Sequence, residues 1–467
     1  MKKLVILVLT VFVFACSDNR KKEFSLIDHI PKDTEIFLTS PDIKSFNKEI
    51  ENNDFLKQSE FPLKTKITSQ FSFFRYLKLD HEAGISFSNL SSETFTYTIS
   101  TKRDSALVQL DSVKNRSVET IKEAGVSFQR IELDKTTFFL HETGNTAIIS
   151  NSRQKISDLA NGENLLKDKS FQKAYMASDP GKTSVFIKHE ALEELSGFFR
   201  NFNFPGFKNF AEWSVLDMDL NKSSTRANGL SLTSDAEKLL QVFSGTNPKN
   251  IESTKVCPED FLSMYALSFS SFEKLHTNLQ KTRKDSTQLE YPKVLNHTRE
   301  IASIRLKKGN AMILNAIEIE AAKEELAGTG NHIETYRGSS IIEMNEAINL
   351  QKVFSGILKI EKNKFYTIID HFIIFSRDVD VLKKILTDFQ NADTIASKTY
   401  YTELMNSLSS ESSMLLIARL PEFIDFTKEE SGSQNLKFQQ NSLAALQIIH
   451  EDDFAHLHAV FSNSENA

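Results

Sequence analysis

An internal similarity, repeated at a spacing of 225 to 230 residues, constrains the fold of this sequence more than any other feature. The pattern opens with Pro31, Asp33, Phe46 and Lys48, which match Pro258, Asp260, Phe272 and Lys274. Later pairs of segments keep the spacing: residues 136–156 with 363–382, 168–177 with 397–406, 183–199 with 412–426 and 213–220 with 443–450. Self-similarity that persists in this way is typical of a repeated structural unit. We therefore predict two homologous domains, residues 27–253 and 254–467.

The predicted boundary lies beside a polar stretch, Ser244–Thr254, which contains Gly and Pro but no hydrophobic periodicity, as linkers do. Within the first half, short β-prone runs are separated by turn residues, which favours antiparallel hairpins. The expected strands are residues 95–100, 127–133, 136–142, 146–152 and 184–187. The expected fold class is α+β: two tandem homologous domains, each an antiparallel or mixed sheet with helices packed on one face.

The N-terminus has the pattern of an export signal. Lys2 and Lys3 precede an apolar run, Leu4–Phe14, that is too short to span a bilayer and ends at Ala15-Cys16. The segment Val13-Phe14-Ala15-Cys16 resembles the bacterial lipoprotein box. This resemblance implies cleavage after residue 15, a lipid on Cys16, and a tether over residues 16–26; two or three acyl chains give stable anchoring. An ordinary signal peptide with a nearby cysteine remains the alternative.

Composition excludes several classes of function. A formal net charge of −6 and the lack of a basic block beyond Arg20-Lys21-Lys22 argue against binding to nucleic acid. Only 15 glycines occur, and we find no phosphate-binding glycine loop. With Cys16 lipidated, Cys257 has no partner for a disulfide, so the fold depends on its core. We expect Cys257 to be a buried structural residue, and we predict no cofactor.

One stretch near the C-terminus offers metal-ligating side chains. On an expected strand over residues 455–461, His456 and His458 project from one face, and the acidic turn that contains Asp452 lies near its start. Imidazole and carboxylate ligands of this kind suit a divalent ion, and the stretch from His450 to His458 would then serve a metal-dependent envelope hydrolase. The alternative is that the acidic residues form a solvated hairpin turn.

Three other groups of residues have two interpretations each. Asp217 and Asp219 are either surface residues of a strand or half of a catalytic carboxylate set. A phenylalanine-rich run, accompanied by Arg200 and Lys208, either packs in a core or binds a partner, because aromatic residues and Arg are common interface anchors. The members of this run are Phe198, Phe199, Phe202, Phe204, Phe207 and Phe210. A second aromatic cluster, Phe71, Phe73, Phe74 and Tyr76, lies beside Arg75 and Lys78.

The lipoprotein box, the Ser17-Asp18 start of the mature chain and the opening Ile30-Pro31-Lys32-Asp33 resemble the two-repeat lipoproteins of the Bacteroidota, whose domains have no agreed activity. The resemblance implies no functional residues. We expect a non-catalytic binding or scaffold lipoprotein of the cell envelope, anchored to the membrane by its lipid at the outer membrane, facing the periplasm or the surface, with an envelope protein as partner. A carrier of an apolar ligand between the domains is a further alternative.

Overall fold

The structure is a computed structural model, and it describes residues 24–54, 56, 72–92, 95–105, 107–110, 113, 115–123, 125–133, 136–191, 203–283, 290–423 and 442–462. The predicted lipidation site Cys16 and the predicted signal segment lie outside these residues. The same holds for Phe198, Phe199 and Phe202 of the phenylalanine-rich run.

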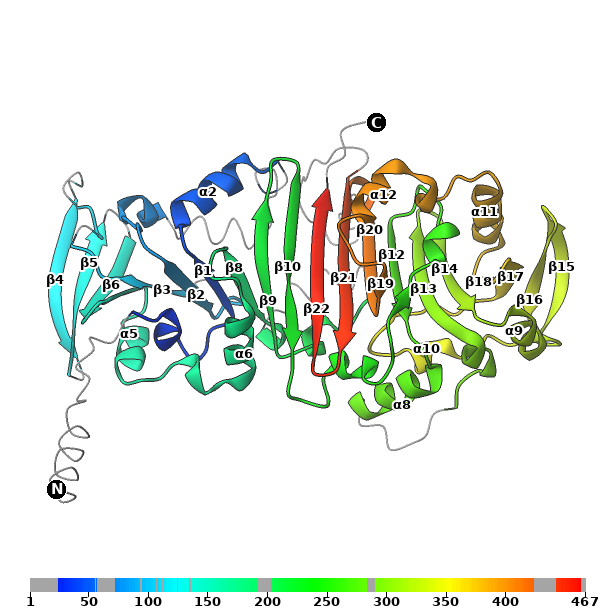
Figure 1. The fold of residues 1–467 in the computed structure, drawn as a ribbon, viewed down its shortest axis with the longest axis horizontal. Helices are drawn as coiled ribbons and strands as arrows, with labels where there is room; N and C mark the ends of the chain where they lie inside the picture. Colours follow the sequence, from blue (N-terminus) through cyan, green and yellow to red (C-terminus); the bar gives the residue numbers. More distant parts are fainter. Residues whose placement is uncertain are drawn as a thin grey trace, which may run out of the picture.

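The fold is α+β and is built around one large antiparallel sheet of 20 strands (Figure 1). The first half contributes β1 (Ile36–Ser40), β2 (Ala83–Ser88), β3 (Thr96–Lys102), β4 (Arg116–Glu123), β5 (Val126–Leu133), β6 (Thr136–Thr143), β7 (Thr146–Ser150), β8 (Ser184–Lys188), β9 (Trp213–Leu220) and β10 (Ser224–Leu232). The second half contributes β12 (Ser263–Ser268), β13 (Thr298–Leu306), β14 (Gly309–Ala316), β15 (Gly330–Tyr336), β16 (Ser339–Met344), β17 (Phe365–Ile369), β18 (Phe372–Ser376), β20 (Met414–Arg419), β21 (Leu443–Glu451) and β22 (Phe454–Ser462).

The α-helices lie between these strands along the chain. They are α2 (Ile43–Asn52), α5 (Arg153–Ala160), α6 (Lys169–Ala177), α8 (Phe272–Thr282), α9 (Ile319–Leu326), α10 (Leu350–Val353), α11 (Val379–Gln390) and α12 (Thr399–Met405). Local capping fixes where several of them begin: the side chain of Asp42 accepts from the Lys44 and Ser45 N–H groups at the start of α2, and that of Asp168 accepts from Phe171 N–H in α6.

The order of strands across the sheet has a simple form. From its outer edge inward, the first half runs β4-β5-β6-β7-β3-β2-β1-β8-β9-β10. The second half, read from its own outer edge, runs β15-β16-β17-β18-β14-β13-β12-β20-β21-β22. The last strands, β10 and β22, pair antiparallel along nine residues each and join the halves into one sheet. We call this pairing the seam.

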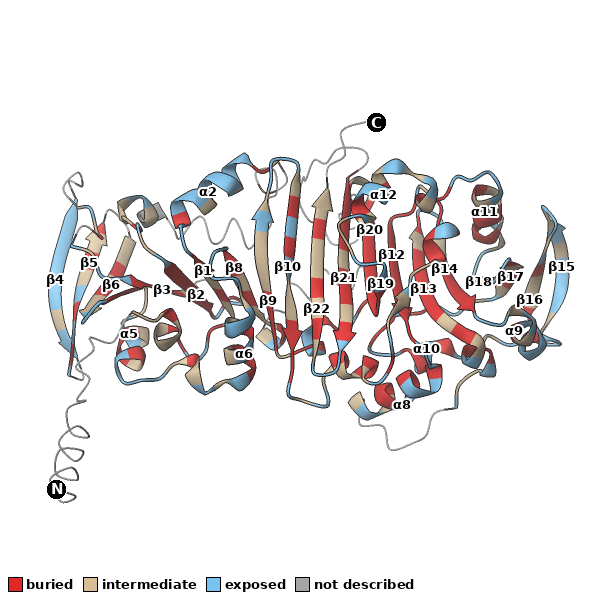
Figure 2. Cartoon of the chain, viewed as in Figure 1, coloured by how far each residue is buried: buried red, intermediate tan, exposed pale blue. Residues whose placement is uncertain are grey.

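Helices cover both faces of the sheet. On one face, α6 packs on Trp213 and Val215 of the first half, and α11 and α12 pack on Met264 and Ile374 of the second half. We call this the α6/α12 face. On the other face, α8, α9 and α10 join a large core around Tyr265. The expectation that helices pack on one face only is therefore wrong for both halves. In the first half, α2 contributes Ile43 to the core around Phe138, on the face opposite to α6. In the second half, strands such as β12 and β20 are buried on both faces (Figure 2).

The chain between the halves is closely packed and does not form a free linker. After β10, η6 (Leu239–Phe243) enters the core around Tyr265, and β11 (Lys249–Asn250) pairs with β19 (Glu411–Ser412). The backbone N–H groups of Glu252 and Ser253 donate to the buried Glu300 carboxylate, at 2.8 and 2.9 Å. The predicted linker Ser244–Thr254 is therefore packed against the second half, and Ser253 and Thr254 are buried there.

Candidate functional site

The α6/α12 face carries a polar strip along the seam, between the core beneath α6 and the core beneath α11 and α12. Alternation along each strand places Asp217 and Asp219 of β9, Arg226 and Asn228 of β10, and His456 and His458 of β22 on the same face as Trp213 and Val460. We call these six residues the seam strip. Asp219, Arg226 and Asn228 are exposed, and the other three are half-buried. The four central strands that carry and flank the strip, β9, β10, β22 and β21, lie side by side in Figure 1.

The two aspartates of the strip have local structural partners. Asp217 accepts a hydrogen bond from Ser184 Oγ at 2.5 Å and from the Asp179 backbone N–H at 3.2 Å. These bonds tie the end of α6 and β8 to β9. Asp219 accepts from Asn221 Nδ2 at 3.3 Å. These hydrogen bonds hold each carboxylate against its own strand, as expected if Asp217 and Asp219 are surface residues of β9 rather than catalytic groups.

The two histidines stand side by side on β22, as the spacing predicted. Their rings are nearly parallel, with centroids 6.4 Å apart and 12° between planes. His458 Nδ1 donates to Asn228 Oδ1 across the seam at 2.8 Å, which leaves its Nε2 as the unprotonated nitrogen of the neutral ring. Burial, and secondarily the charge of His456, lower the pKa of His458. His456 Nε2 lies 3.5 Å from Glu451 Oε1.

This arrangement does not make a complete metal site. Within the described residues, no group of three or more His, Cys, Asp or Glu side chains is placed to hold a metal ion. Glu451, Asp452 and Asp453 are exposed at the β21–β22 turn, where Asp452 adopts a positive φ of 26°. Among the described residues, Glu451 contacts His456, but neither Asp452 nor Asp453 contacts His456 or His458. The solvated-turn interpretation therefore fits the geometry better than the metal interpretation does.

The described part of the phenylalanine-rich run lies in a core. Phe204 and Phe207 are 1% and 8% exposed, and Phe210 is 2% exposed. Phe204 packs against Tyr265 of the second half, with ring centroids 5.6 Å apart. The segment from the first half thus covers the sheet of the second half, and Phe204 and Phe207 are too deeply buried to anchor a partner. Phe74 and Tyr76 of the other aromatic cluster pack against the core around Phe138.

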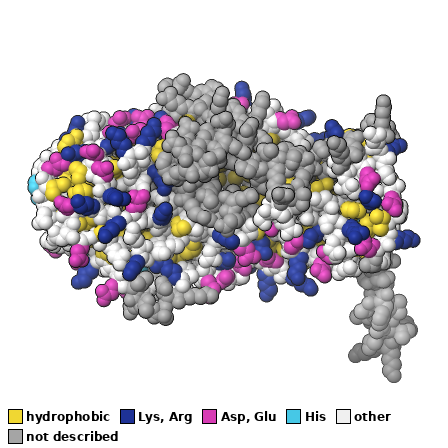
Figure 3. Space-filling view, turned by 180° about the vertical axis from the view of Figure 1, so that it is seen from behind, with side chains coloured by type: hydrophobic (Ala, Val, Ile, Leu, Met, Phe, Trp, Pro, Cys, Tyr) yellow, Lys and Arg dark blue, Asp and Glu magenta, His cyan; other side chains and the backbone are white. Residues whose placement is uncertain are grey.

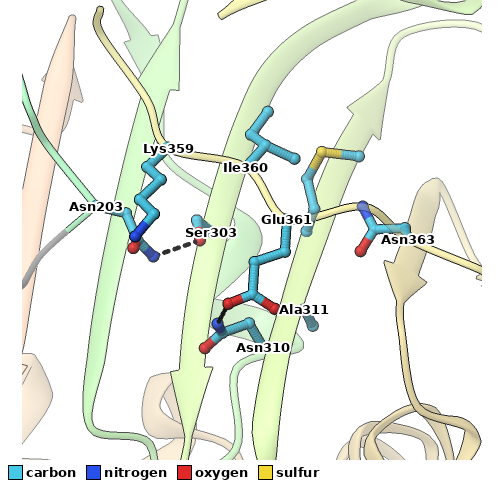
Figure 4. A pocket seen from close by; sticks show the side chains of 9 residues that line it. Asn203, Ser303, Asn310, Ala311, Lys359, Ile360, Glu361 and Asn363 are labelled. Carbon is cyan, nitrogen blue, oxygen red and sulfur yellow. Dashed lines mark hydrogen bonds between the residues drawn. The ribbon is translucent and has the colours of Figure 1, made fainter. Parts of the chain in front are cut away.

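Two further candidates are a buried cysteine and a small cavity. Cys257 is fully buried in the core around Ile374, and burial raises the pKa of its thiol, as expected for a structural cysteine. A cavity beside Asn203, Ser303 and Asn310 has a volume of about 10 Å³, enough for one water molecule (Figure 4). In it Asn203 Nδ2 donates to Ser303 Oγ at 3.0 Å. This cavity is far too small for an apolar ligand.

No sequence pattern pointed to a buried chain of hydrogen bonds that joins the segment around Phe207 to strands β9 and β10 of the first half. His189 Nδ1 donates to the Phe207 carbonyl at 3.0 Å, and its Nε2 accepts from Ser214 Oγ at 2.7 Å; Ser214 in turn bonds Ser231 at 2.5 Å. Burial lowers the pKa of His189 to about 4. His189, Ser214 and Ser231 are distant in sequence and follow no motif spacing, so no sequence pattern predicted their contact. All three side chains are 2% exposed or less, which rules out attack by Ser214 on a substrate.

Comparisons with known proteins leave the family open. No family model matches the chain, and no curated protein matches it in sequence. Among solved structures, crystal forms I, III and IV of TP0453 are 11–12% identical, with a TM-score of 0.28; the matches cover 44–46% of this chain and 79–81% of those chains. Likeness at this level carries no conclusion about fold or function. In the part of the chain that the structure describes, no helix combines the length and apolar character needed to cross a bilayer.

Proposed function

We propose that this protein is a lipid-anchored lipoprotein of the cell envelope that acts as a non-catalytic binding or scaffold protein, with the seam strip as part of its binding surface. The observation that carries the proposal is the strip itself. It presents charged and hydrogen-bonding side chains from both halves on strands that are held by continuous antiparallel pairing from β9 to β21. A surface held in this way is preorganised for a partner, which lowers the cost of binding.

The proposal includes a duplicated architecture of two related domains, 27–253 and 254–467. Matching contacts in the two halves support it. Leu165 N–H donates to the Ile30 carbonyl at 3.0 Å, and Ile395 N–H donates to the Cys257 carbonyl at 2.9 Å. The pairing order across the sheet, given above, supports it in the same way.

Side chains give a second set of matching contacts. Ser150 Oγ donates to the Tyr97 carbonyl on the neighbouring strand β3 at 2.6 Å, and Ser376 Oγ donates to the Asn310 carbonyl at 2.9 Å. The ion pair of Lys155 with Asp33 has a looser counterpart in that of Lys384 with Asp260, since Lys384 lies about one helical turn beyond the position that matches Lys155. Contacts shared at this level of detail favour two copies of one design over two unrelated sheets that happen to pair.

The membrane anchor is tested through Cys16. Metabolic labelling with a radioactive fatty acid, followed by fractionation, is expected to place labelled protein in the membrane pellet. The Cys16→Ser variant is expected to lose the label and to leave the pellet. Unlabelled protein from the unaltered chain, found in the soluble fraction, would contradict the anchor.

The binding function is tested by affinity capture from detergent-solubilised envelope, with paired variants as controls. The charge-reversed variant Asp219→Lys with Arg226→Glu alters two exposed residues of the strip. The control Glu320→Lys with Lys323→Glu reverses an exposed ion pair on α9. We expect a partner that the unaltered protein and the control retain and that the strip variant loses. Equal recovery with the strip variant would exclude the strip as the binding surface.

A further inference from the structure

The strand β4 forms the outer edge of the sheet in the first half. It pairs with β5 from Arg116 opposite Leu133 to Glu123 opposite Val126, and within the described residues no second strand pairs with it. Seven of its eight residues are exposed and Ile121 is half-buried (Figure 2). An edge strand of this kind presents a row of outward-directed backbone N–H and C=O groups, which are the groups that recruit an added strand.

The opposite edge of the sheet is built differently. The outer strand there, β15, shifts its register against β16 between His332 and Glu334, and such a bulge twists an edge and interrupts its ladder. The register of β4 against β5 is continuous over all eight residues. Bulges are a common protection of edges against further pairing, and β4 lacks one. Of the two edges, β4 is therefore the one suited to accept a strand.

The side chains of β4 separate by charge between the two faces. Arg116, Val118, Thr120 and Lys122 lie on the face of the core around Phe138, since Val118 is opposite Ile131 of that core. Ser117, Glu119, Ile121 and Glu123 lie on the face of α5, since Ile121 is opposite Phe128. One face of the edge is thus basic and the other acidic, each around a β-branched apolar residue. Val118 is 49% exposed.

Arg116 already donates to the Leu110 carbonyl, whereas the acidic residues of β4 have weak contacts. Glu119 lies 3.8 Å from Arg130, and Glu123 lies 3.5 Å from Arg153, in ion pairs that face solvent. Exposed pairs of this kind contribute little and exchange easily. Seen from behind, the end of the molecule that carries β4 shows acidic and basic side chains around hydrophobic ones (Figure 3).

A second copy of this chain is a poor occupant of the edge. A copy added antiparallel through a two-fold axis perpendicular to the sheet keeps its own faces, so basic residues would lie beside basic ones and acidic beside acidic. Like charges on directly opposed strand positions are destabilising. The separation of charge between the faces therefore opposes self-association and selects for a strand with the complementary pattern.

We propose that β4 accepts, by antiparallel strand addition, an extended segment of a partner protein with acidic residues opposite Arg116 and Lys122 and basic residues opposite Glu119 and Glu123. The segment has β-branched residues opposite Val118 and Ile121. Main-chain hydrogen bonds supply affinity in this mode of recognition, and the alternating side chains supply specificity. The inference rests on the proposed binding function and names the class of partner.

A synthetic peptide tests the proposal on the full chain. The probe is Lys-Glu-Val-Thr-Arg-Ile-Thr-Glu, written to oppose Glu123 through Arg116, with a fluorophore for anisotropy. The control peptide, Glu-Lys-Val-Thr-Glu-Ile-Thr-Lys, has every charge reversed. We expect the probe to bind about tenfold more tightly than the control, because four opposed charge pairs change sign between them. Amide exchange of residues 116–123 is expected to slow with the probe alone.

A variant with reversed charges on β4 completes the test. In Glu119→Lys with Lys122→Glu, both residues are exposed, and far-UV circular dichroism checks that the fold is retained. We expect the preference between the two peptides to disappear. Equal binding of both peptides by the unaltered chain, binding of neither, or a preference that survives in the variant would each overturn the proposal. Capture of a partner through the seam strip does not depend on these results, so the two proposals fail separately.

Discussion

His458 Nδ1 lies 2.8 Å from Asn228 Oδ1, and each residue is the fifth of a nine-residue strand at the seam. The two are directly opposed in the pairing of β10 with β22, which extends evenly from them to Ser224 opposite Ser462 and Leu232 opposite Phe454. The midpoint of the seam is therefore a hydrogen bond between corresponding positions of the two halves. One position carries an imidazole and the other an amide, so the pairing is symmetric in register but not in side-chain chemistry.

The Asn228–His458 bond is expected to contribute modestly to stability. A double-mutant cycle with Asn228→Ala and His458→Ala should give a coupling free energy of about 1 kcal/mol, since Asn228 is exposed and water replaces part of the bond. Urea unfolding at pH 7.5 measures it. The exposed pair His332 and Thr335, whose side chains are 3.0 Å apart, provides the matched control cycle and should couple less. A coupling of zero at the seam would mean that the bond is not formed.

The buried His189 is expected to make the protein sensitive to acid. Because burial lowers its folded pKa from 6.5 to about 4, the unfolded chain binds more protons between these values. Stability is therefore retained above pH 6.5 and lost as the pH falls toward 4, by roughly 3 kcal/mol in total. The His189→Gln variant keeps a donor and an acceptor but cannot titrate. Urea unfolding at pH 7 and pH 4.5 should show a smaller loss for this variant; an unchanged loss would assign the acid sensitivity to other groups.

Much of the local structure follows from the sequence, because it depends on patterns within short segments. Alternation and turn residues predicted strands that coincide with β5, β6 and β7, and the strand expected over residues 455–461 lies within β22. The antiparallel α+β class followed from the short turns. The seam did not follow, since the pairing of β10 with β22 joins residues such as Asn228 and His458 that are 230 positions apart. No local pattern specifies which of several half-buried strands meets another.

In the candidate site, too, features set within short segments follow from the sequence, and features set by contacts between distant segments do not. Placing His456 and His458 on one face required only the two-residue period of a strand. Their partner Asn228, and the burial of Phe204 beneath the sheet of the other half, depend on contacts between distant segments. The polarity of the stretch Ser244–Thr254 predicted a linker, but in the structure Ser253 and Thr254 are buried, and the Glu300 carboxylate accepts a hydrogen bond from the backbone of that segment.

The carboxylate of Glu300 is expected to hold the connecting segment onto the second half. It is fully buried and accepts from two backbone N–H groups and from Asn315 Nδ2 at 3.0 Å. Glu300→Ala removes the acceptor and leaves those donors unsatisfied, which should cost about 3 kcal/mol. Glu300→Gln keeps one acceptor oxygen and should cost less. Urea unfolding compares the two variants, and equal costs would show that the donors find other partners.

The close approach of β9 and β10 depends on the absence of a side chain at Gly229. A Cβ atom there would lie 1.9 Å from the Val215 carbonyl oxygen, so the strands must separate to admit it. Gly229→Ala is expected to destabilise the protein by about 2 kcal/mol or more, as overpacking does. Gly181→Ala is the control, since its nearest neighbour is an Asp179 side-chain oxygen at 3.2 Å. Thermal unfolding followed by circular dichroism measures both, and similar midpoints would contradict the close approach.

Disulfide formation across the seam tests most directly whether the two halves form one sheet in the stated register. Ala227→Cys with Ala459→Cys, and Asn228→Cys with His458→Cys, replace two adjacent directly opposed pairs in a Cys16→Ser background. Adjacent antiparallel pairs alternate between Cα separations of about 4.5 and 5.5 Å, both within reach of a disulfide. In the control, Ala227→Cys is combined with Ala455→Cys, which lies four residues along β22 and about 13 Å away. We predict an intramolecular disulfide, seen by non-reducing electrophoresis and mass spectrometry, in the opposed pairs and not in the control. Failure of both opposed pairs to close in folded protein, or closure of the control to the same extent, would contradict the single sheet.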